Sequence, residues 1–369
     1  PRRGYLPLPV LDSTDPGVVL AGAQGGDLRR TLVLVSTKSG GTVETASLLR
    51  YFYNRMVDAL GAEEGGRHLA AITDPGSSLA DLARQLGFRR CFLNDPNIGG
   101  RYSALSLFGL LPAALLGVDL ERVLQRAEQC AHQCGPDVAA SENPAVRLGV
   151  ALGACALAGR DKLTFLTARG LESFGDWAEQ LIAESTGKEG KGILPVVGES
   201  LGAPAEYGTD RVFAWLGLGG DGARARRAPR ALEALQRAGH PVLRLSLADR
   251  YDLGAQFFLW EMATAIAGWL LGINPFDQPD VESAKVRARE MVAAYAASGS
   301  LPEDPPAALT AQTLTEFLRQ AQPGGYVAIQ AYLQPGRETE AALQRLRRAL
   351  RARTRLPVTV AYAPRSLHS

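Results

Sequence analysis

The chain has 369 residues, of which 46% are hydrophobic and 21% are charged, so it is long enough to build more than one ordinary globular core. Its 40 lysines and arginines nearly balance 38 aspartates and glutamates, and the net charge of +2 gives no reason to expect a nucleic acid or an anionic membrane as partner. The four cysteines are too few and too scattered for a disulfide framework, which favours a reducing compartment such as the cytoplasm.

Short apolar runs alternate with longer segments of helical period along the chain, as in a parallel sheet covered by helices. The first part contains three such pairs: Thr31–Ser36 with Val43–Leu60, His68–Thr73 with Ser77–Leu86, and Lys162–Thr167 with Leu171–Ser185. A second series follows, with strands over Arg211–Leu218 and Pro241–Ser246 and a helix that ends at Gly272. We therefore expect an α/β fold with two doubly wound parallel-sheet lobes, and a site at the carboxyl ends of the strands.

The most apolar segment, Gln256–Gly272, is predicted to be a core helix. It contains Glu261 and is shorter than the ~20 apolar residues that a membrane span needs. No signal-peptide pattern follows Pro1. After the Pro-rich linker at Gly299–Pro306, a strand, a helix and a strand are expected over Tyr326–Leu333, Glu338–Arg353 and Val358–Tyr362.

The first segment that suggests chemistry is a polar turn after the first strand. Three hydroxyl side chains and two glycines stand directly before a helix, whose unpaired first amides and dipole favour a phosphate. The residues of this turn are Thr37, Lys38, Ser39, Gly40, Gly41 and Thr42. Taken alone, Thr42 or Ser39 could equally serve only to cap the helix.

Three further segments carry side chains that could act on a substrate. Arg101 follows paired glycines in a polar loop, from which a guanidinium could stabilise an oxyanion. Gln180 and Glu184 are four residues apart and share a helical face, and a carboxylate there could transfer protons. Lys285 lies early in a helix that follows Asn274-Pro-Phe-Asp277. Each of these residues, considered singly, is more typical of a capping or solvated side chain.

Together the four segments resemble motifs of the glucose-6-phosphate isomerase family, both in their residues and in their order along the chain. The matching stretches are Thr37-Lys-Ser-Gly-Gly-Thr-Val-Glu-Thr45, Gly99-Gly-Arg-Tyr-Ser103, Gln180 to Lys188 and Asn274 to Lys285, with Gly41 in place of a family threonine. The resemblance covers nearly the whole chain. It is greatest to the bacterial branch in which the isomerase is fused behind a transaldolase, and it implies that both ends of this chain are truncated.

The resemblance implies two lobes of the sugar-isomerase (SIS) type and assigns roles to the site. Residues 1–137 and 138–298 would form the lobes, and residues 299–369 a C-terminal βαβ extension packed on the second lobe. The Thr37–Thr42 turn and Gln180 would hold the phosphorylated hexose, with Arg101 beside the enediolate. Glu184 would be the proton-transfer base, and Lys285 would assist ring opening.

The implied activity is the reversible isomerisation of glucose 6-phosphate and fructose 6-phosphate in glycolysis and gluconeogenesis, adjacent to the pentose phosphate pathway. It needs neither metal nor organic cofactor. The resemblance also allows a homodimer and, in a longer protein, a fused transaldolase domain. The family's ring-opening histidine is absent, and Tyr207 is nearest to its place. Ring opening could use Tyr207, a residue from outside the chain, or open-chain substrate.

Other patterns suggest other kinds of site. Gly217-Leu-Gly-Gly-Asp-Gly222 has the spacing of a dinucleotide-binding turn, but Pro229 interrupts the helix that should follow. Cys130 and Cys134 lack further zinc ligands at suitable spacing. The arginines over Arg345–Arg355 are more typical of a solvated helix face than of a nucleic-acid site. A non-catalytic or truncated sugar-phosphate-binding module stays open as the alternative to an enzyme.

Overall fold

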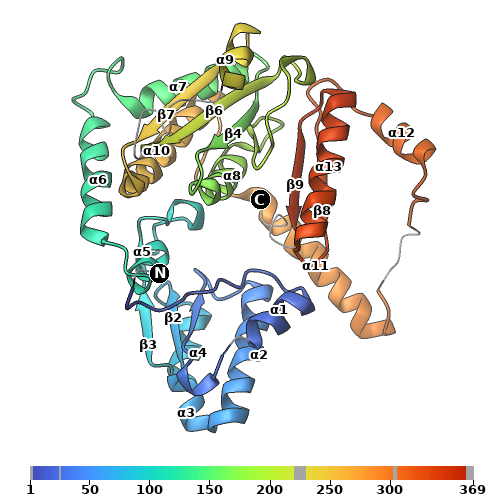
Figure 1. Ribbon diagram of the computed structural model, residues 1–369. Coiled ribbons are helices and arrows are strands. Elements are labelled where there is room, and N and C mark those ends of the chain that lie inside the picture. The colour runs from blue at the N-terminus through green and yellow to red at the C-terminus, as the bar shows by residue number, and fades with distance from the viewer. Residues whose placement is uncertain (1–2, 25, 220–229, 302–305, 363–369) are drawn as a thin grey trace. The chain divides into compact units, whose positions relative to one another are not determined.

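A computed structural model of the chain describes residues 3–24, 26–219, 230–301 and 306–362, without the side chains of residues 280–285 and 288. The chain divides into two compact units. The first comprises residues 1–139, 250–261 and 332–336, and the second comprises residues 140–249, 262–331 and 337–369. Each unit contains at least one parallel sheet, as the alternating pattern predicted (Figure 1).

The elements agree closely with the predicted order. The strands are β1 Val33–Ser36, β2 Leu69–Thr73, β3 Arg90–Leu93, β4 Lys162–Thr167, β5 Leu194–Val196, β6 Arg211–Leu218, β7 Val242–Leu247, β8 Val327–Ala331 and β9 Val358–Tyr362. The helices are α1 Pro16–Ala23, α2 Val43–Leu60, α3 Ala62–Arg67, α4 Ser78–Gln85, α5 Leu107–Leu115, α6 Leu120–Gln133, α7 Pro144–Leu157, α8 Glu172–Thr186, α9 Arg230–Arg237, α10 Leu253–Leu271, α11 Pro279–Ser298, α12 Ala311–Arg319 and α13 Arg337–Thr354.

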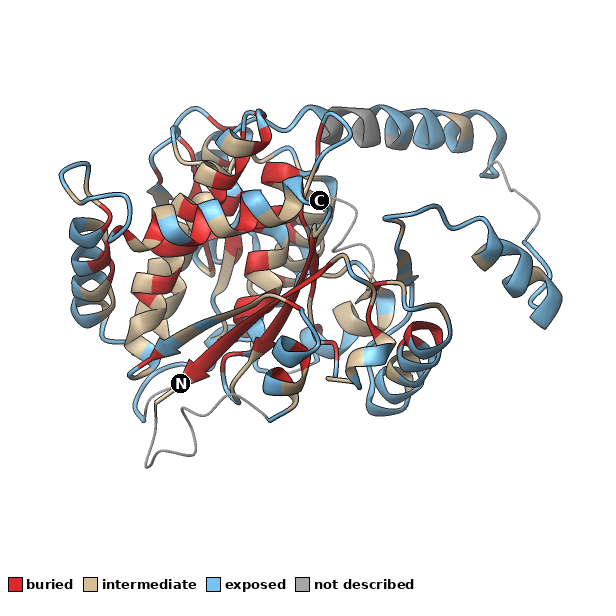
Figure 2. Ribbon diagram, turned by 90° about the horizontal axis from the view of Figure 1, so that it is seen from above, coloured by how far each residue is buried: buried red, intermediate tan, exposed pale blue. Residues whose placement is uncertain are grey.

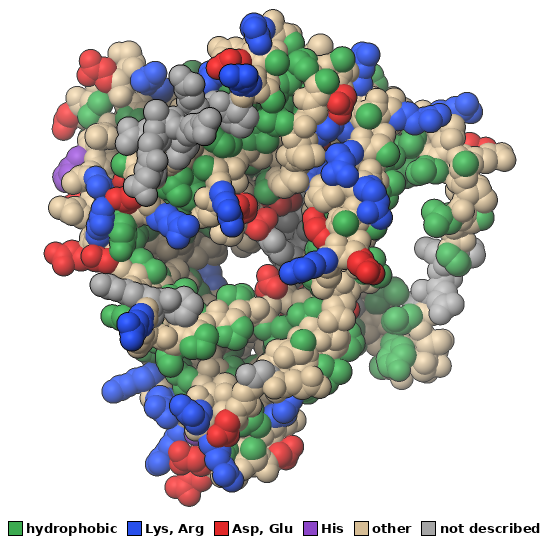
Figure 3. Space-filling view, in the orientation of Figure 1, with side chains coloured by type: hydrophobic (Ala, Val, Ile, Leu, Met, Phe, Trp, Pro, Cys, Tyr) green, Lys and Arg blue, Asp and Glu red, His purple; other side chains and the backbone are tan. Residues whose placement is uncertain are grey.

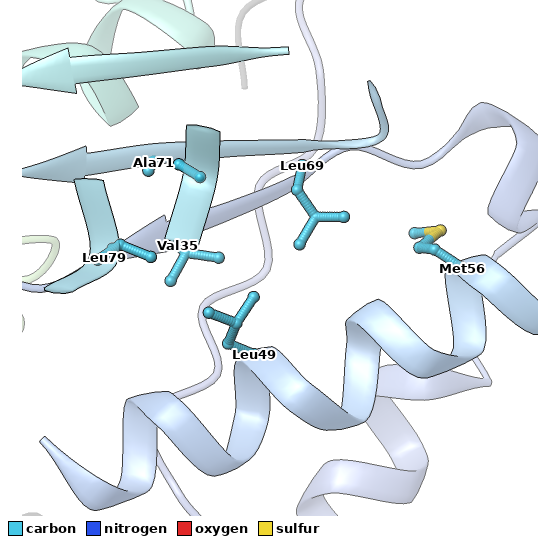
Figure 4. Packing of buried hydrophobic residues seen from close by; sticks show 7 residues of the cluster. Val35, Leu49, Met56, Leu69, Ala71 and Leu79 are labelled. Atoms are coloured by element: carbon cyan, nitrogen blue, oxygen red, sulfur yellow. The ribbon is translucent and has the colours of Figure 1, made fainter. Parts of the chain in front are cut away.

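The first unit holds a three-stranded parallel sheet in the order β1-β2-β3. Strand β2 is buried along its whole length because it is the central strand. Leu49 and Met56 of α2 pack onto Val35 of β1 and Leu69 of β2, and Leu79 of α4 completes this core (Figure 4). Leu49 and Met56 are seven residues apart, so they fall on the same face of the helix.

The second unit holds a four-stranded parallel sheet in the order β5-β4-β6-β7. Strands β4 and β6 are buried over nearly every residue, as is typical of the central strands of a parallel sheet (Figure 2). The close approach of α7 to α10 depends on small residues. A Cβ at Gly149 would lie 2.6 Å from the carbonyl oxygen of Ala263, so a larger residue would force the helices apart.

The C-terminal segment forms a parallel βαβ unit, in which β8 pairs with β9 and α13 packs on β9 (Figure 1). Arg347 and Arg351 of α13 are only 1% and 2% exposed. The expectation of a purely solvated arginine face is therefore wrong for these two residues, although Arg345, Arg348 and Arg353 are exposed. Part of the predicted linker, residues 302–305, lies outside the described residues.

Charged side chains of both signs are interspersed over the molecular face shown in Figure 3, as the nearly balanced composition suggests. No helix in the described ranges is long and apolar enough to cross a membrane. The described residues also contain no group of three or more His, Cys, Asp or Glu that could hold a metal ion.

The stability of the protein should fall as the pH rises because of Glu261 on α10. Burial raises the pKa of this carboxyl group to about 8, above the ~4.3 of an unfolded chain. The folded state therefore holds the proton more tightly, and the unfolding free energy is highest below the unfolded pKa and decreases until the pH passes about 8. Urea unfolding at pH 5 to 9 should show that Glu261→Gln removes this loss. The exposed Glu142→Gln is the control, and equal pH profiles for wild type and Glu261→Gln would contradict the prediction.

Candidate functional site

The Thr37–Thr42 turn lies at the carboxyl end of β1, where the sequence placed it. Gly40 has φ +76°, and a Cβ at this position would clash with the hydroxyl of Ser78 and the backbone nitrogen of Leu79. Only glycine therefore lets the turn lie against the start of α4. Thr42 is the N-cap of α2, yet its hydroxyl makes no capping hydrogen bond. The interpretation of Thr42 as a mere cap is thus not supported, and its hydroxyl remains available to a ligand.

Lys38 fixes this turn to the neighbouring loops. Its Nζ lies 2.5 Å from Asp74 Oδ2 and donates to the carbonyl oxygen of Pro96 at 2.7 Å. The backbone carbonyl of Lys38 accepts hydrogen bonds from the Asp74 amide and from the hydroxyl of Thr73. The ammonium group is thus already engaged with a carboxylate and a carbonyl, so its contribution is to hold the turn in shape.

Arg101 lies in a short 3-10 helix, Gly100–Tyr102, beyond the end of β3. It is 4% exposed, and its guanidinium carbon lies 5.4 Å from the centre of the Tyr102 ring. The buried Asn94 holds the start of the loop. Its backbone N–H donates to the Thr73 carbonyl oxygen, and its side-chain oxygen accepts a hydrogen bond from the backbone N–H of Leu107. These bonds place the arginine on a well-fixed support at the same sheet edge as the Thr37–Thr42 turn.

Gln180 and Glu184 meet on one face of α8, as their spacing predicted. Gln180 Nε2 lies 3.3 Å from Glu184 Oε2. Glu184 lies away from the carboxyl ends of the strands, where the sequence predicts the site. Helix α8 leads back from the end of β4, and Thr186 in its last turn bonds to Ile193 just before β5 begins. Glu184 therefore lies at the amino-terminal edge of the second sheet.

Lys188 joins the end of α8 to the Asn274–Asp277 turn. Its nearly buried ammonium donates to the carbonyl oxygens of Asn274 and Asp277, each at 2.7 Å, and lies 2.5 Å from Asp277 Oδ1. Glu189 and Gly190 both have positive φ and reverse the chain directly after it. Two motifs that are about 90 residues apart in the sequence are thereby placed side by side.

Lys285 belongs to α11, which begins at Pro279 close to this turn, but its side chain lies outside the described residues. Tyr207 is a core residue. It is 5% exposed, burial raises the pKa of its hydroxyl, and the oxygen accepts a hydrogen bond from the Gly202 amide. The hydroxyl is thus engaged inside the unit, so we assign Tyr207 no part in ring opening. Of the predicted dinucleotide turn, residues 220–222 lie outside the described residues.

A buried cluster of charges was not recognised from the sequence. The carboxylate of Glu199 forms two ion pairs: Arg211 Nη1 lies 3.1 Å from its Oε2, and Arg351 Nη1 lies 3.2 Å from its Oε1. Arg211 also donates a hydrogen bond to the hydroxyl of Thr164. Arg351 further binds Glu206, whose pKa is lowered by the Ala203 amide and then by this guanidinium. The only sequence signal was the spacing of Arg347 and Arg351, four residues apart with the apolar Leu350 between them.

Parallel sheets flanked by helices, with a hydroxyl- and glycine-rich turn at the start of a long helix, define an α/β protein with a turn that suits a phosphate. No family model matches the chain. The chain is 31% identical over 325 residues to the glucose-6-phosphate isomerase of Rubrobacter xylanophilus, covering 77% of this chain and 74% of that protein. The chain belongs to the glucose-6-phosphate isomerase family.

A second relative and a solved structure are also similar to the chain. The glucose-6-phosphate isomerase of Enterococcus faecalis is 28% identical over 288 residues, which cover 69% of this chain and 64% of that protein. The chain therefore spans just under two thirds of the length of this relative. Among solved structures, a hypothetical protein from Thermus thermophilus superposes with a TM-score of 0.69 at 28% identity, covering 77% of this chain and 76% of that one.

Replacing Lys188 should destabilise the second unit. Lys188→Met removes the donor from two carbonyl oxygens and a carboxylate, and we expect the unfolding free energy to fall by about 2 kcal/mol. Lys191 is a matched control, since its ammonium is bonded to one carbonyl, that of Leu271. Lys191→Met should cost less than ~1 kcal/mol. Chemical denaturation of the three proteins measures both effects, and equal losses would show that the Asn274–Asp277 turn does not depend on Lys188.

Proposed function

We propose that this protein interconverts glucose 6-phosphate and fructose 6-phosphate through an enediolate. The observation that carries the proposal is Glu184, a half-buried carboxylate hydrogen-bonded to Gln180 on a helix end that Lys188 fixes to the Asn274–Asp277 turn. Family membership supports it, since the relatives are named for this activity. The alternative is a module that binds a sugar phosphate without catalysis. Binding without isomerisation by the wild-type chain would favour this alternative.

In the proposed reaction Glu184 takes the proton from C2 of the open-chain sugar and returns it to C1. The electron pair released from the C2–H bond forms the C1–C2 double bond, and the carbonyl oxygen O1 becomes the enediolate oxygen. When the proton returns to C1, the C1–C2 pair forms the new C1–H bond, O2 becomes the C2 carbonyl oxygen, and the hydroxyl proton of O2 is transferred to O1. A carboxylate can serve both carbons because they are adjacent. The oxyanion has its largest charge along the reaction path, so the fixed guanidinium of Arg101 would lower the barrier more than it strengthens substrate binding.

Substrate binding in this proposal depends on the Thr37–Thr42 turn and on Gln180. The Thr42 hydroxyl, which makes no capping hydrogen bond, and the first amides of α2 suit a dianionic phosphate. Lys38 would act through the shape of the turn, because its ammonium is bonded to Asp74 and Pro96. Lys285 would assist ring opening, and Tyr207, the residue nearest to the place of the absent family histidine, is enclosed in the second unit. We further propose that the protein acts in the cytoplasm, in glycolysis and gluconeogenesis. We propose that it assembles as a homodimer and that, in a longer protein, it is fused to a transaldolase.

Glu184→Gln should separate binding from chemistry. The substitution keeps the shape of the side chain and removes the base, so isomerisation should fall by about 10²- to 10⁴-fold while the sugar phosphate still binds. A coupled assay from fructose 6-phosphate measures turnover, and solvent deuterium exchange at C2 measures the proton transfer. Glu189→Gln, exposed and five residues further on, is the control. Exchange at the parent rate in Glu184→Gln would mean that another group is the base.

Thr42→Val should weaken substrate binding more than it slows turnover. The change removes one hydroxyl donor from the phosphate turn, and phosphate contacts are nearly the same in the ground and transition states. We expect KM to rise by about tenfold, the factor that ~1.4 kcal/mol represents, with kcat changed by less than about threefold. Thr45→Val, three residues into α2, is the matched control. A loss confined to kcat would place the phosphate elsewhere.

A further inference from the structure

The segments that follow β1, β2 and β3 meet at the carboxyl edge of the first sheet, and Asp74 belongs to the middle one. Strand β2 is the central strand of the order β1-β2-β3, and Asp74 follows it directly. It therefore lies between the Thr37–Thr42 turn and the loop that carries Arg101. The proposed reaction gives Asp74 no part, although both neighbouring segments belong to the proposed site.

Asp74 joins these two segments through the side chain of Lys38. The Lys38 ammonium lies 2.5 Å from Asp74 Oδ2 and donates to the carbonyl oxygen of Pro96 at 2.7 Å. Pro96 is in the loop that leads to Arg101, five residues before it. One carboxylate thus holds an ammonium group from the Thr37–Thr42 turn on a backbone oxygen of the arginine loop.

The segment from Pro96 to Arg101 is stiffened by its own hydrogen bonds. Asp95 Oδ1 accepts from the backbone N–H of Asn97 at 2.9 Å and from its side-chain amide at 3.0 Å. The backbone N–H of Ile98 donates to the carbonyl oxygen of Asp95. A shift of Pro96 is therefore passed on toward Arg101 rather than absorbed between them.

The surroundings of Asp74 favour a role in positioning over a role in stability. Its Oδ1 is buried, and no described residue donates a hydrogen bond to it. A buried acceptor without a donor destabilises the folded state, so its presence calls for another explanation. The backbone of the turn does not need the carboxylate, because the Lys38 carbonyl oxygen accepts from the backbone N–H of Asp74 and from the hydroxyl of the buried Thr73. The carboxylate instead acts on the Lys38 ammonium.

We propose that Asp74 is a positioning residue, which sets the spacing between the Thr37–Thr42 turn and the Arg101 guanidinium. It does so by holding Lys38 on Pro96. The inference rests on the proposed function, in which the substrate carries its phosphate on C6 and reacts at C1 and C2. The turn and the guanidinium must then be spaced to fit both ends of one molecule, and a misplacement of about 1 Å can cost about 10²-fold in rate.

Equilibrium binding of two stable analogues tests this role in Asp74→Asn, a change that keeps the size of the side chain and removes its charge. Sorbitol 6-phosphate has the phosphate but no charge near C1 and C2, whereas the carboxylate of 5-phosphoarabinonate takes the place of the enediolate. Calorimetry should show that Asp74→Asn binds 5-phosphoarabinonate about tenfold more weakly than wild type, because this analogue depends on the placement of Arg101. Affinity for sorbitol 6-phosphate should fall by less than about threefold.

The matched control is Asp81→Asn on α4. The wild-type carboxylate of Asp81 also pairs with a cation, the exposed Arg84, but the pair lies within one helix. This variant should bind both analogues like wild type.

The outcomes separate the positioning role from the proposed function. If Asp74→Asn loses no more affinity for 5-phosphoarabinonate than for sorbitol 6-phosphate, the positioning role is overturned while the isomerase activity stands. A wild-type protein that binds 5-phosphoarabinonate no more tightly than sorbitol 6-phosphate would contradict the enediolate step, and the positioning role with it.

Kinetics of Lys38→Met test the same role from the other partner, should Asp74→Asn fail to fold. This variant removes the ammonium that Asp74 holds, so kcat should fall by about tenfold while KM changes by less than about threefold. Where both variants fold, the double variant should be no slower than Lys38→Met, since the two side chains act together. Losses that multiply in the double variant, or an effect on KM alone, would refute the positioning role.

Discussion

Parallel pairing of the strands is the constraint on which the placement of the candidate site residues depends. Because every strand of a sheet points the same way, the segments that follow the strands collect at one edge, and each helix returns the chain to the other. In the first unit this brings the Thr37–Thr42 turn and the loop of Arg101 to a common edge. In the second unit the same rule carries Glu184, near the end of α8, to the amino-terminal edge.

Two lysines from the family motifs, one in each unit, hold distant segments together through the same kind of contacts. Lys38 joins its turn to Asp74 and Pro96, and Lys188 joins the end of α8 to Asn274 and Asp277. In both cases the ammonium group binds a carboxylate and a backbone carbonyl from distant segments. Loops held in this way lose little further freedom when a substrate arrives, which is the preorganisation that catalysis by positioning and electrostatics requires.

The charges around Glu199 give the second unit a polar centre that a purely apolar core would lack. Two arginines, one from β6 and one from α13, bind one buried carboxylate. Removing either partner of such a pair is costly because it leaves an uncompensated charge, so the C-terminal helix and the sheet depend on each other.

The sequence by itself determined the α/β class, most element positions and the pairing of Gln180 with Glu184, because helical and strand periods and a four-residue spacing are local properties. It also placed Gly40 in the turn after β1, although not the close approach of Ser78 that requires a glycine there. Only the tertiary structure decided that Arg347 and Arg351 are buried, that Tyr207 is enclosed and that Lys188 holds Asp277. These features arise from contacts between segments far apart in the chain, and burial of a charge depends on partners that no local pattern contains.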